Sequence, residues 1–161
     1  MDDQDSLEKL YREAAPSLLA YFRHQPALHG VAEDLLHDTF VRALRHRDRL
    51  ERAVSSRAYL FGIARHVGLD AVRRLKPACE AADLAVAPDS LPDERLDSMR
   101  TAIAELPALH REALLLRLQQ DLSYEEIAEV LDVPVGTVRS RLHHAVLRLR
   151  QALNPPIAYE N

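Results

Sequence analysis

The chain has 161 residues, of which 47% are hydrophobic, and a formal net charge of −4. Cys79 is its single cysteine, which excludes an internal disulfide and a four-cysteine zinc site, and the apolar content excludes a disordered chain. The start of the chain is acidic and lacks an apolar signal core, and no apolar run approaches the roughly 20 residues of a membrane span, so we expect a soluble, cytoplasmic protein.

The composition, rich in helix-forming side chains with only four glycines, predicts an all-α fold. A first amphipathic helix is expected from Leu7 to Phe22, and Pro16 should kink it or split it. Pro26 and Gly30 end that unit. A second helix should run from about Val31 to His46, and its inward side chains are expected to be Leu36, Phe40, Ala43 and Leu44.

The second helix carries a group of acids that could be read as a metal site. Asp34 and Asp38 lie four residues apart, as do Glu33 and His37. Metal sites in helix bundles need ligands from several facing helices, and the chain shows no second Glu-x-x-His pair. Ordinary helix charge pairs, such as Asp38 with Arg42, are the simpler interpretation. We therefore expect no metal and no other cofactor.

Residues 47–56 are predicted to be a connection, and Ser55 or Ser56 should cap a third helix that runs to about Leu75. Six arginines lie between residues 42 and 57. They fit a solvated turn or a surface that faces phosphates equally well. Tyr59 and Phe61 could hold unstacked bases or could simply be core residues, and the sequence does not decide between the two.

The chain composition changes at residues 76–93, where prolines, small residues and acids replace the periodic pattern. We predict a flexible linker here between two small helical domains, at 1–75 and 94–153, with a tail at 154–161. Fully extended, the linker would reach roughly 60 Å, but as a coil it would average about 25 Å.

Two helices are predicted directly after the linker. Leu96, Met99, Ile103 and Leu106 mark the first, which stops at Pro107. The next, at the sequence LHREALLLRLQQ, should pack beneath the helices that follow.

A helix-turn-helix is predicted from Leu122 to Leu153. Ser123 and Glu126 have the spacing of a capping box. Asp132 and Val133 form the break, Pro134 suits the first position of the next helix, and Gly136 should relieve crowding between two helices. The inner face of the second helix is expected to hold Val138, Leu142, Ala145, Val146, Leu149 and Leu153.

The two helices of this motif differ in the sign of their charged residues. Residues 133–153 hold four arginines and no acid, whereas residues 121–132 hold five acids and no basic residue. A face that serves solubility alone would mix its signs, so we favour DNA binding over a plain αα-hairpin, with the second helix in a major groove.

In their order these motifs resemble the small two-domain sigma factors of bacterial RNA polymerase, the extracytoplasmic-function group. The sequence DLLHDTFVRAL at 34–44 resembles the helix that binds polymerase, usually written D-L-x-Q-E-T-F. RAYLFGIARHVGLDAVRR at 57–74 resembles the helix that reads the −10 promoter element. The segment from Leu106 to Arg150 resembles the domain that reads the −35 element. His37 and Asp38 replace the usual Gln and Glu, Tyr59 replaces a frequent Trp, and His66 replaces a frequent Asn.

The resemblance implies a protein that is not itself an enzyme, with core RNA polymerase, promoter DNA and an anti-sigma factor as partners. For the −35 element it implies base contacts from Arg139, Ser140, His143 and His144, with Thr137 and Arg141 nearer the phosphates. For the −10 element the corresponding positions are Arg52, Ser55, Ser56 and Arg57, with Arg65, Arg73 and Arg74 along the backbone. For polymerase binding they are Asp34, Asp38 and Thr39, which we expect on the outward face of the second helix.

A coil averaging about 25 Å would not hold two DNA-reading domains one or two helical turns apart, roughly 34–70 Å, so a scaffold should set that distance. Two rival interpretations remain open. The first is an ordinary regulator whose helix-turn-helix binds an operator while its first half senses a ligand or dimerises. The second is a helical metalloenzyme built on Glu33, His37 and Asp38.

Overall fold

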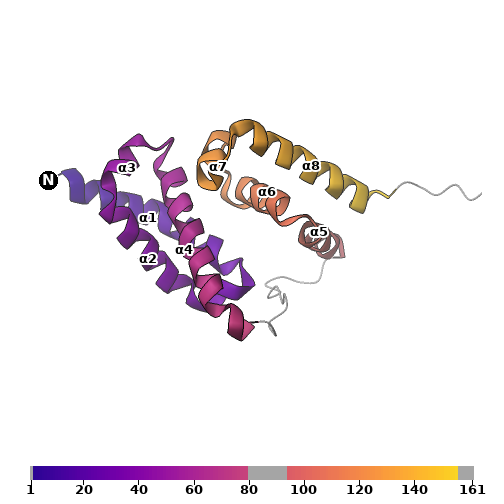
Figure 1. Cartoon of the computed structure of the whole chain (residues 1–161), viewed down its shortest axis with the longest axis horizontal. Helices are drawn as coiled ribbons and strands as arrows, with labels where there is room; N and C mark the ends of the chain where they lie inside the picture. The colour runs from indigo at the N-terminus through magenta and orange to yellow at the C-terminus, as the bar shows by residue number, and fades with distance from the viewer. Residues whose placement is uncertain (1, 80–93, 156–161) are drawn as a thin grey trace, which may run out of the picture. The chain divides into compact units, whose positions relative to one another are not determined.

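The computed structural model describes residues 2–79 and 94–155, and within these ranges its regular elements are all helices (Figure 1). The all-α prediction is therefore confirmed. The chain divides into two compact units. Helices α1 to α4 lie in the first unit, whereas α5, α6, α8 and the start of α7 lie in the second.

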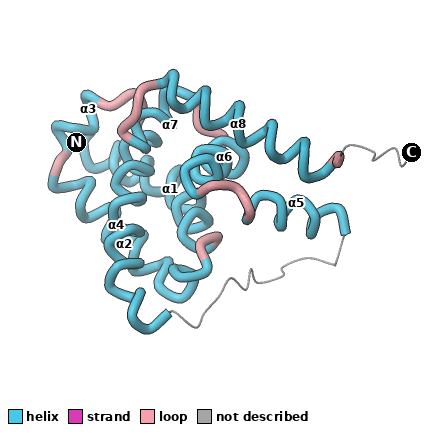
Figure 2. The backbone as a smooth tube through the Cα atoms, turned by 45° about the vertical axis from the view of Figure 1, so that its right-hand side comes forward, coloured by secondary structure: helices cyan, strands magenta, loops and turns pink. Residues whose placement is uncertain are grey.

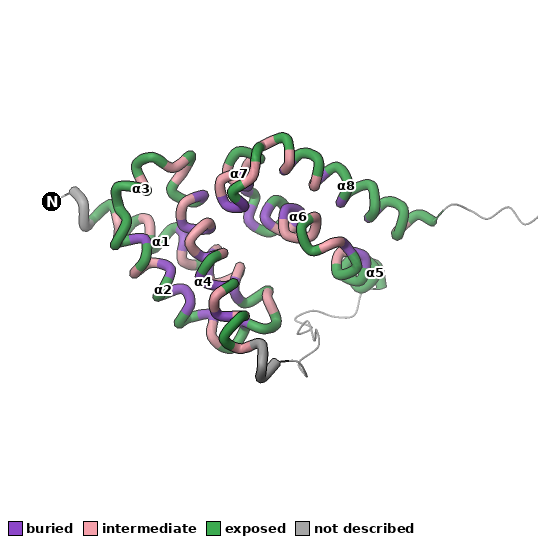
Figure 3. The backbone as a smooth tube through the Cα atoms, viewed as in Figure 1, coloured by how far each residue is buried: buried purple, intermediate pink, exposed green. Residues whose placement is uncertain are grey.

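The first unit consists of α1 (Asp2–Arg23), the 3₁₀ turn η1 (Pro26–Val31), α2 (Ala32–Arg45), α3 (Arg47–Arg52) and α4 (Ser56–Cys79). Helices α1, α2 and α4 pack against one another, and η1 contacts all three. Their buried positions face inward (Figure 3). The largest fully buried side chains of this core are Leu18, Phe22, Leu28, Leu60, Phe61 and Val67.

Helix α1 runs unbroken through Pro16, so of the two effects predicted for this proline, a kink or a split, the split does not occur. A proline inside a helix removes one hydrogen bond and costs about 3 kcal/mol. Leu18 and Phe22, which follow Pro16, are fully buried. Burial of two such side chains contributes about 1.5–3 kcal/mol each, which offsets the proline.

The predicted connection at 47–56 is partly helical, because α3 occupies Arg47–Arg52. His46 is at once the last cap of α2 and the first cap of α3. Tyr59 of α4 donates its hydroxyl to the His46 carbonyl at 2.8 Å, which ties the start of α3 to α4. Helix α4 continues to Cys79, past the predicted end near Leu75, and the rest of the predicted linker lies outside the described residues.

The second unit contains α5 (Glu94–Ala104), α6 (Ala108–Gln120), α8 (Val135–Leu153) and the start of α7 (Tyr124–Leu131), and Figure 2 shows these segments as helices separated by loops. Both α5 and α6 pack against α8, and the packing of α6 was predicted. The core of this unit comprises Ala113, Leu114, Leu116, Leu122, Ile127, Val138, Leu142 and Ala145.

Apolar positions in three of the predicted helices are more exposed than the sequence pattern suggested, and Met99 of α5, which is 39% exposed, is one of them. Leu44 of α2 is 48% exposed and Val146 of α8 is 39% exposed, so both predictions were wrong. Leu96, which marked α5 in the sequence, is also 48% exposed. In each case helical spacing placed the residue at the edge of the apolar stripe, where the neighbouring helix does not reach it. No helix within the described ranges has the length and apolarity needed to cross a membrane.

Candidate nucleic-acid interface

The helix-turn-helix begins with the predicted capping box at the start of α7. The Glu126 amide donates to Ser123 Oγ at 3.1 Å, and the Ser123 amide donates to Glu126 Oε1 at 3.0 Å. Two amides at the helix start are thereby satisfied reciprocally, which confirms the prediction.

The turn between α7 and α8 depends on Asp132, whose φ of 54° is left-handed. The Val133 amide donates to the Ala128 carbonyl at 3.0 Å and the Asp132 amide to the Glu129 carbonyl at 3.2 Å. This pair of bonds is a Schellman motif, which ends a helix sharply. The predicted break at Asp132 and Val133 is confirmed.

Two details of the start of α8 differ from the sequence predictions. Pro134 is the N-cap and Val135 the first helical residue, so proline stands one position earlier than expected. Gly136 was predicted to relieve crowding, but a Cβ added there would meet no atom within 4 Å. That prediction was wrong, because this turn of α8 faces open space.

Helix α8 has a buried face and two accessible faces. Val138, Leu142, Ala145 and Leu149 are three or four residues apart and buried. Arg139, Ser140 and His143 lie on an exposed face away from the core. Arg141 and His144 lie on a third face, and Thr137 is half-buried near its start. The structure thus brings all six predicted −35 residues onto one helix.

His110 of α6 was not predicted, and the structure places it beside the third face of α8. Its ring stacks on that of His144, with centroids 5.9 Å apart, and the His143 ring lies 5.8 Å from His144. Burial lowers the pKa of His110, and the positive charges of His144, Arg148 and Arg141 lower it further. No sequence signal pointed to this residue, because the contact joins two different helices.

The first unit carries the residues predicted for the −10 element. Ser55 caps α4, since the Ala58 amide donates to Ser55 Oγ at 3.0 Å, which confirms one of the two predicted caps. Arg52, Ser56 and Arg57 are exposed beside it. Farther along α4, Arg65 is half-buried, whereas Arg73 and Arg74 are exposed.

The structure separates the two aromatic residues whose role the sequence left open. Phe61 is 1% exposed and meets Tyr21 edge to face at 5.6 Å, so it is a core residue. Tyr59 is half-buried, and burial raises its pKa. The guanidinium of Arg57 lies 6.0 Å from the centre of the Phe61 ring.

Ion pairs link the helices of the first unit in a way that the sequence did not show. Arg42 pairs with Asp70 of α4 at 3.5 Å, rather than with Asp38 as suggested, and Arg73 also approaches Asp70 at 3.9 Å. Glu33 pairs with Arg23 of α1 at 3.6 Å. Among the described residues, no three histidine, cysteine or acidic side chains lie close enough to hold a metal ion.

On α2 the three residues predicted to contact polymerase differ in exposure. Asp34 and Asp38 are exposed, as expected. Thr39 is 0% exposed and donates its hydroxyl to the Leu35 carbonyl at 2.7 Å. Its placement on the outward face was wrong, because one residue beyond Asp38 the helix turns toward the core.

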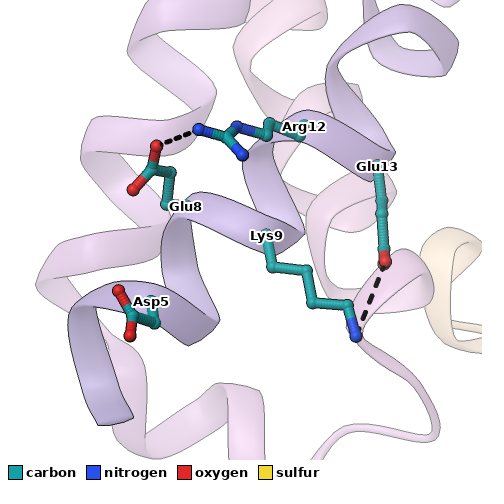
Figure 4. A pocket seen from close by; sticks show the side chains of 5 residues that line it. All are labelled: Asp5, Glu8, Lys9, Arg12 and Glu13. Atoms are coloured by element: carbon teal, nitrogen blue, oxygen red, sulfur yellow. Dashed lines mark hydrogen bonds and ion pairs between the residues drawn. The ribbon is translucent and has the colours of Figure 1, made fainter. Parts of the chain in front are cut away.

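A hollow on α1 lies apart from all these residues. It is lined by Asp5, Glu8, Lys9, Arg12 and Glu13 (Figure 4). Arg12 pairs with Glu8, and Lys9 lies 4.0 Å from Glu13. Because four of its five charged side chains form pairs along one exposed helix face, it is an ordinary solvated surface.

Comparison with known proteins relates both units to one class of transcription factor. Residues 10–77 match the family model for Sigma-70 region 2, and residues 96–149 match that for Sigma-70 region 4. The chain is 32% identical to RNA polymerase sigma factor YlaC of Bacillus subtilis, with 94% of each chain covered. It is 39% identical to ECF RNA polymerase sigma factor SigC of Mycobacterium tuberculosis, over 77% of this chain and 69% of the relative.

A solved structure resembles the chain over most of its length. It is the sigma factor RpoE in complex with the anti-sigma factor NepR from Bartonella quintana, with a TM-score of 0.70, 27% identity, and 94% of this chain and 98% of the other covered.

Proposed function

The chain belongs to the extracytoplasmic-function sigma factors of bacterial RNA polymerase, and from that premise we propose how its two units divide promoter recognition. As a sigma factor it directs promoter-specific transcription initiation. The proposal is that the first unit binds core polymerase and reads the −10 element, while the second unit reads the −35 element. One observation carries this division: each family model matches residues within one compact run of helices, region 2 at 10–77 and region 4 at 96–149.

For the −35 element we assign the exposed face of α8 to the bases. Arg139 and His143 lie one turn apart, with Ser140 beside them, and all three are exposed. The major groove admits an α-helix, and an arginine there can bind guanine through two hydrogen bonds. Thr137 and Arg141, which are half-buried and lie outside this face, are assigned to phosphates.

For the −10 element we assign the junction of α3 and α4. Arg52, Ser56 and Arg57 are exposed around the Ser55 cap, so donors surround the start of α4. Extruding a base costs a few kcal/mol, and contacts of this kind must offset it. Arg65, Arg73 and Arg74 are assigned to the backbone farther along α4, although Arg73 also approaches Asp70.

For polymerase binding we retain the exposed carboxylates Asp34 and Asp38 and omit the buried Thr39. Two acids one turn apart suit a basic surface on the core enzyme. We further propose an anti-sigma factor as a partner, because the related RpoE of Bartonella quintana is bound to one. We also propose that the protein has no enzymatic activity of its own and acts in the cytoplasm, where core polymerase binds the chromosome.

Run-off transcription with core polymerase and a promoter library tests the proposal. We expect transcripts only when both proteins are present, from promoters that share two elements. The rival operator-binding regulator makes the opposite prediction, since it would bind a specific DNA site tightly without core polymerase. A specific site bound equally well with and without the core enzyme, and no promoter-dependent transcript, would contradict the proposed function.

A further inference from the structure

The segment at residues 46–55, which carries two of the proposed −10 contacts, has no side chain in the core. It consists of the cap residue His46, helix α3 and the loop that leads into α4 (Figure 1). Three of its residues are half-buried and the other seven are exposed. A segment with so few buried apolar contacts opens easily unless other contacts hold it. The shape of this segment must therefore depend on a small number of hydrogen bonds.

Tyr59 of α4 holds both ends of the segment. Its hydroxyl donates to the His46 carbonyl at 2.8 Å, and its backbone amide donates to the Ser55 carbonyl at 3.1 Å. Every residue except proline has an amide that could form the second bond, whereas the first needs a side chain with a donor at its far end. The neighbours of Tyr59 on α4, Ala58 and Leu60, are fully buried. The segment is thus tied at both ends to a residue that the core keeps in place.

The His46 carbonyl is the group on which α3 begins. It accepts the Arg49 amide at 3.0 Å, and the Tyr59 hydroxyl uses its second acceptor position. Helix α3 has neither a side-chain cap at its start nor a buried residue. The hydroxyl of Tyr59 is therefore one of the few contacts from outside α3 that can fix where this helix starts.

The hydroxyl of Tyr59 remains a donor throughout the physiological pH range. Burial raises the pKa of Tyr59, Arg49 lowers it and Asp48 raises it. Both charged residues belong to α3, so the electrostatic contacts of the hydroxyl also come from the helix that it holds. A pKa above the ordinary value keeps on the oxygen the proton that the hydrogen bond requires.

We propose that Tyr59 is a positioning residue for −10 recognition, whose hydroxyl acts through the His46 carbonyl to hold segment 46–55 in the shape that presents Arg52 to the DNA. This inference rests on the proposed −10 function of the junction of α3 and α4. It gives Tyr59 a role besides the two that the sequence left open, base stacking and core packing. The role belongs to the hydroxyl, so the Tyr59 ring need not touch a base.

Amide hydrogen exchange on the free, full-length chain tests the structural part of the proposal. Tyr59→Phe removes the hydroxyl and keeps the ring. We expect the amides of residues 46–55 to exchange about two- to tenfold faster, which is the net contribution of one hydrogen bond, while exchange in the second unit stays unchanged. The melting temperature should change little. Unchanged exchange at 46–55 would refute the proposal.

Tyr11→Phe is the matched control in the same unit. The Tyr11 ring lies 4.6 Å from that of Phe40, and no hydrogen bond of the Tyr11 hydroxyl is found among the described residues. The same chemical change at Tyr11, which is 45% exposed, should leave exchange at 46–55 as it is in the wild type. Equal acceleration by both variants would show that the effect is not specific to the bond with His46 and would contradict the proposal.

Promoter competition with the holoenzyme tests the functional part. Two promoters share one −35 element and differ at one −10 base pair, and permanganate footprinting measures the ratio in which they are opened. This ratio cancels any change in the amount of active protein, so a purely structural defect would leave it unchanged. We expect Tyr59→Phe to lower the ratio about two- to tenfold at the base pair where Arg52→Ala also lowers it, with the −35 preference unaffected.

The double variant shows whether the hydroxyl acts through Arg52. Once Arg52 has been replaced by alanine, Tyr59→Phe should have no further effect on the ratio, because the side chain that it positions is gone. Losses that multiply in the double variant would mean that the hydroxyl acts on the DNA independently of Arg52, and the positioning role would be wrong.

The outcomes distinguish this inference from the proposed function on which it rests. If Arg52→Ala leaves every −10 preference intact, the assignment of the −10 element to the junction of α3 and α4 fails, and the positioning role fails with it. If Arg52→Ala lowers a −10 preference that Tyr59→Phe leaves at the wild-type value, the proposed function stands and only the role of Tyr59 is refuted.

Discussion

At the scale of single residues, neighbouring positions on one helix have different environments. Arg139 is exposed on the outward face of α8, Leu142 is buried in the core, and His144 stacks on α6. On α2 the same alternation separates the exposed Asp38 from the buried Thr39. Because an α-helix has 3.6 residues per turn, each residue is rotated by about 100° from the one before it. A step of one or two positions can therefore move a side chain from the exposed face to the core, and roles must be argued residue by residue.

Arg139 and Arg141 should differ in what they recognise. We expect Arg139→Ala to cost about 1–3 kcal/mol at one base pair of the −35 element, because a bidentate contact is lost. Arg141→Ala should weaken all −35 sequences alike and reduce the salt dependence of binding. Holoenzyme binding to a panel of −35 duplexes at several salt concentrations measures both. Identical sequence rankings for the wild type and the Arg139 variant would count against the assignment.

Gly136 should tolerate a side chain as far as the fold is concerned. A Cβ there meets no atom within 4 Å, and alanine favours helix over glycine by up to about 1 kcal/mol. We therefore expect Gly136→Ala to leave the melting temperature unchanged or raise it slightly, as measured by circular dichroism. A clear drop in melting temperature would show that the glycine has a structural role after all.

At the scale of elements, short-range signals determine where the helices of the helix-turn-helix begin and end. Ser123 and Glu126 start α7, and the left-handed Asp132 ends it. Asp121, with a φ of 51°, ends α6 in the same conformation. In the first unit the Tyr59 hydroxyl fixes the start of α3, so this short helix depends on a contact from α4.

Helix α2 provides a test that separates surface from core. Asp34→Arg together with Asp38→Arg should abolish holoenzyme formation without unfolding the protein, because both side chains are exposed. Co-purification with core polymerase measures the effect, with the melting temperature as its control. Thr39→Ala is the matched comparison: it should lower stability, because it removes a buried side chain, yet leave binding by the folded protein intact. Normal yield of holoenzyme from the double variant would place the contact elsewhere.

At the scale of the whole molecule, the two units each have their own core, and our proposal assigns a different promoter element to each unit. A coil of the predicted linker's length, averaging about 25 Å, would not by itself set the distance between promoter elements. In our proposal the core enzyme sets that distance, so we expect specific promoter binding to need the holoenzyme.

The assignment of one promoter element to each unit predicts the result of a loop exchange. Replacing residues 50–56 with the corresponding segment of a relative should change which −10 sequences are opened and leave the −35 preference unchanged. Permanganate footprinting of open complexes on a promoter panel reads out the first effect, and competition between −35 duplexes reads out the second. An unchanged opening pattern would mean that the segment only connects α2 to α4 and that its arginines are solvated.

Much of this protein follows from its sequence. Helical spacing, the capping box and the break at Asp132 predicted the helix-turn-helix, because these signals act within one helix or turn. The order along the chain of the three motifs at 34–44, 57–74 and 106–150 indicated the family. Tertiary structure decided the rest: that Thr39 and Phe61 are core residues, that α1 continues through Pro16, that Arg42 pairs with Asp70, and that His110 meets His144. Each of these depends on which neighbouring helix packs against the residue, and that information is not contained in local spacing.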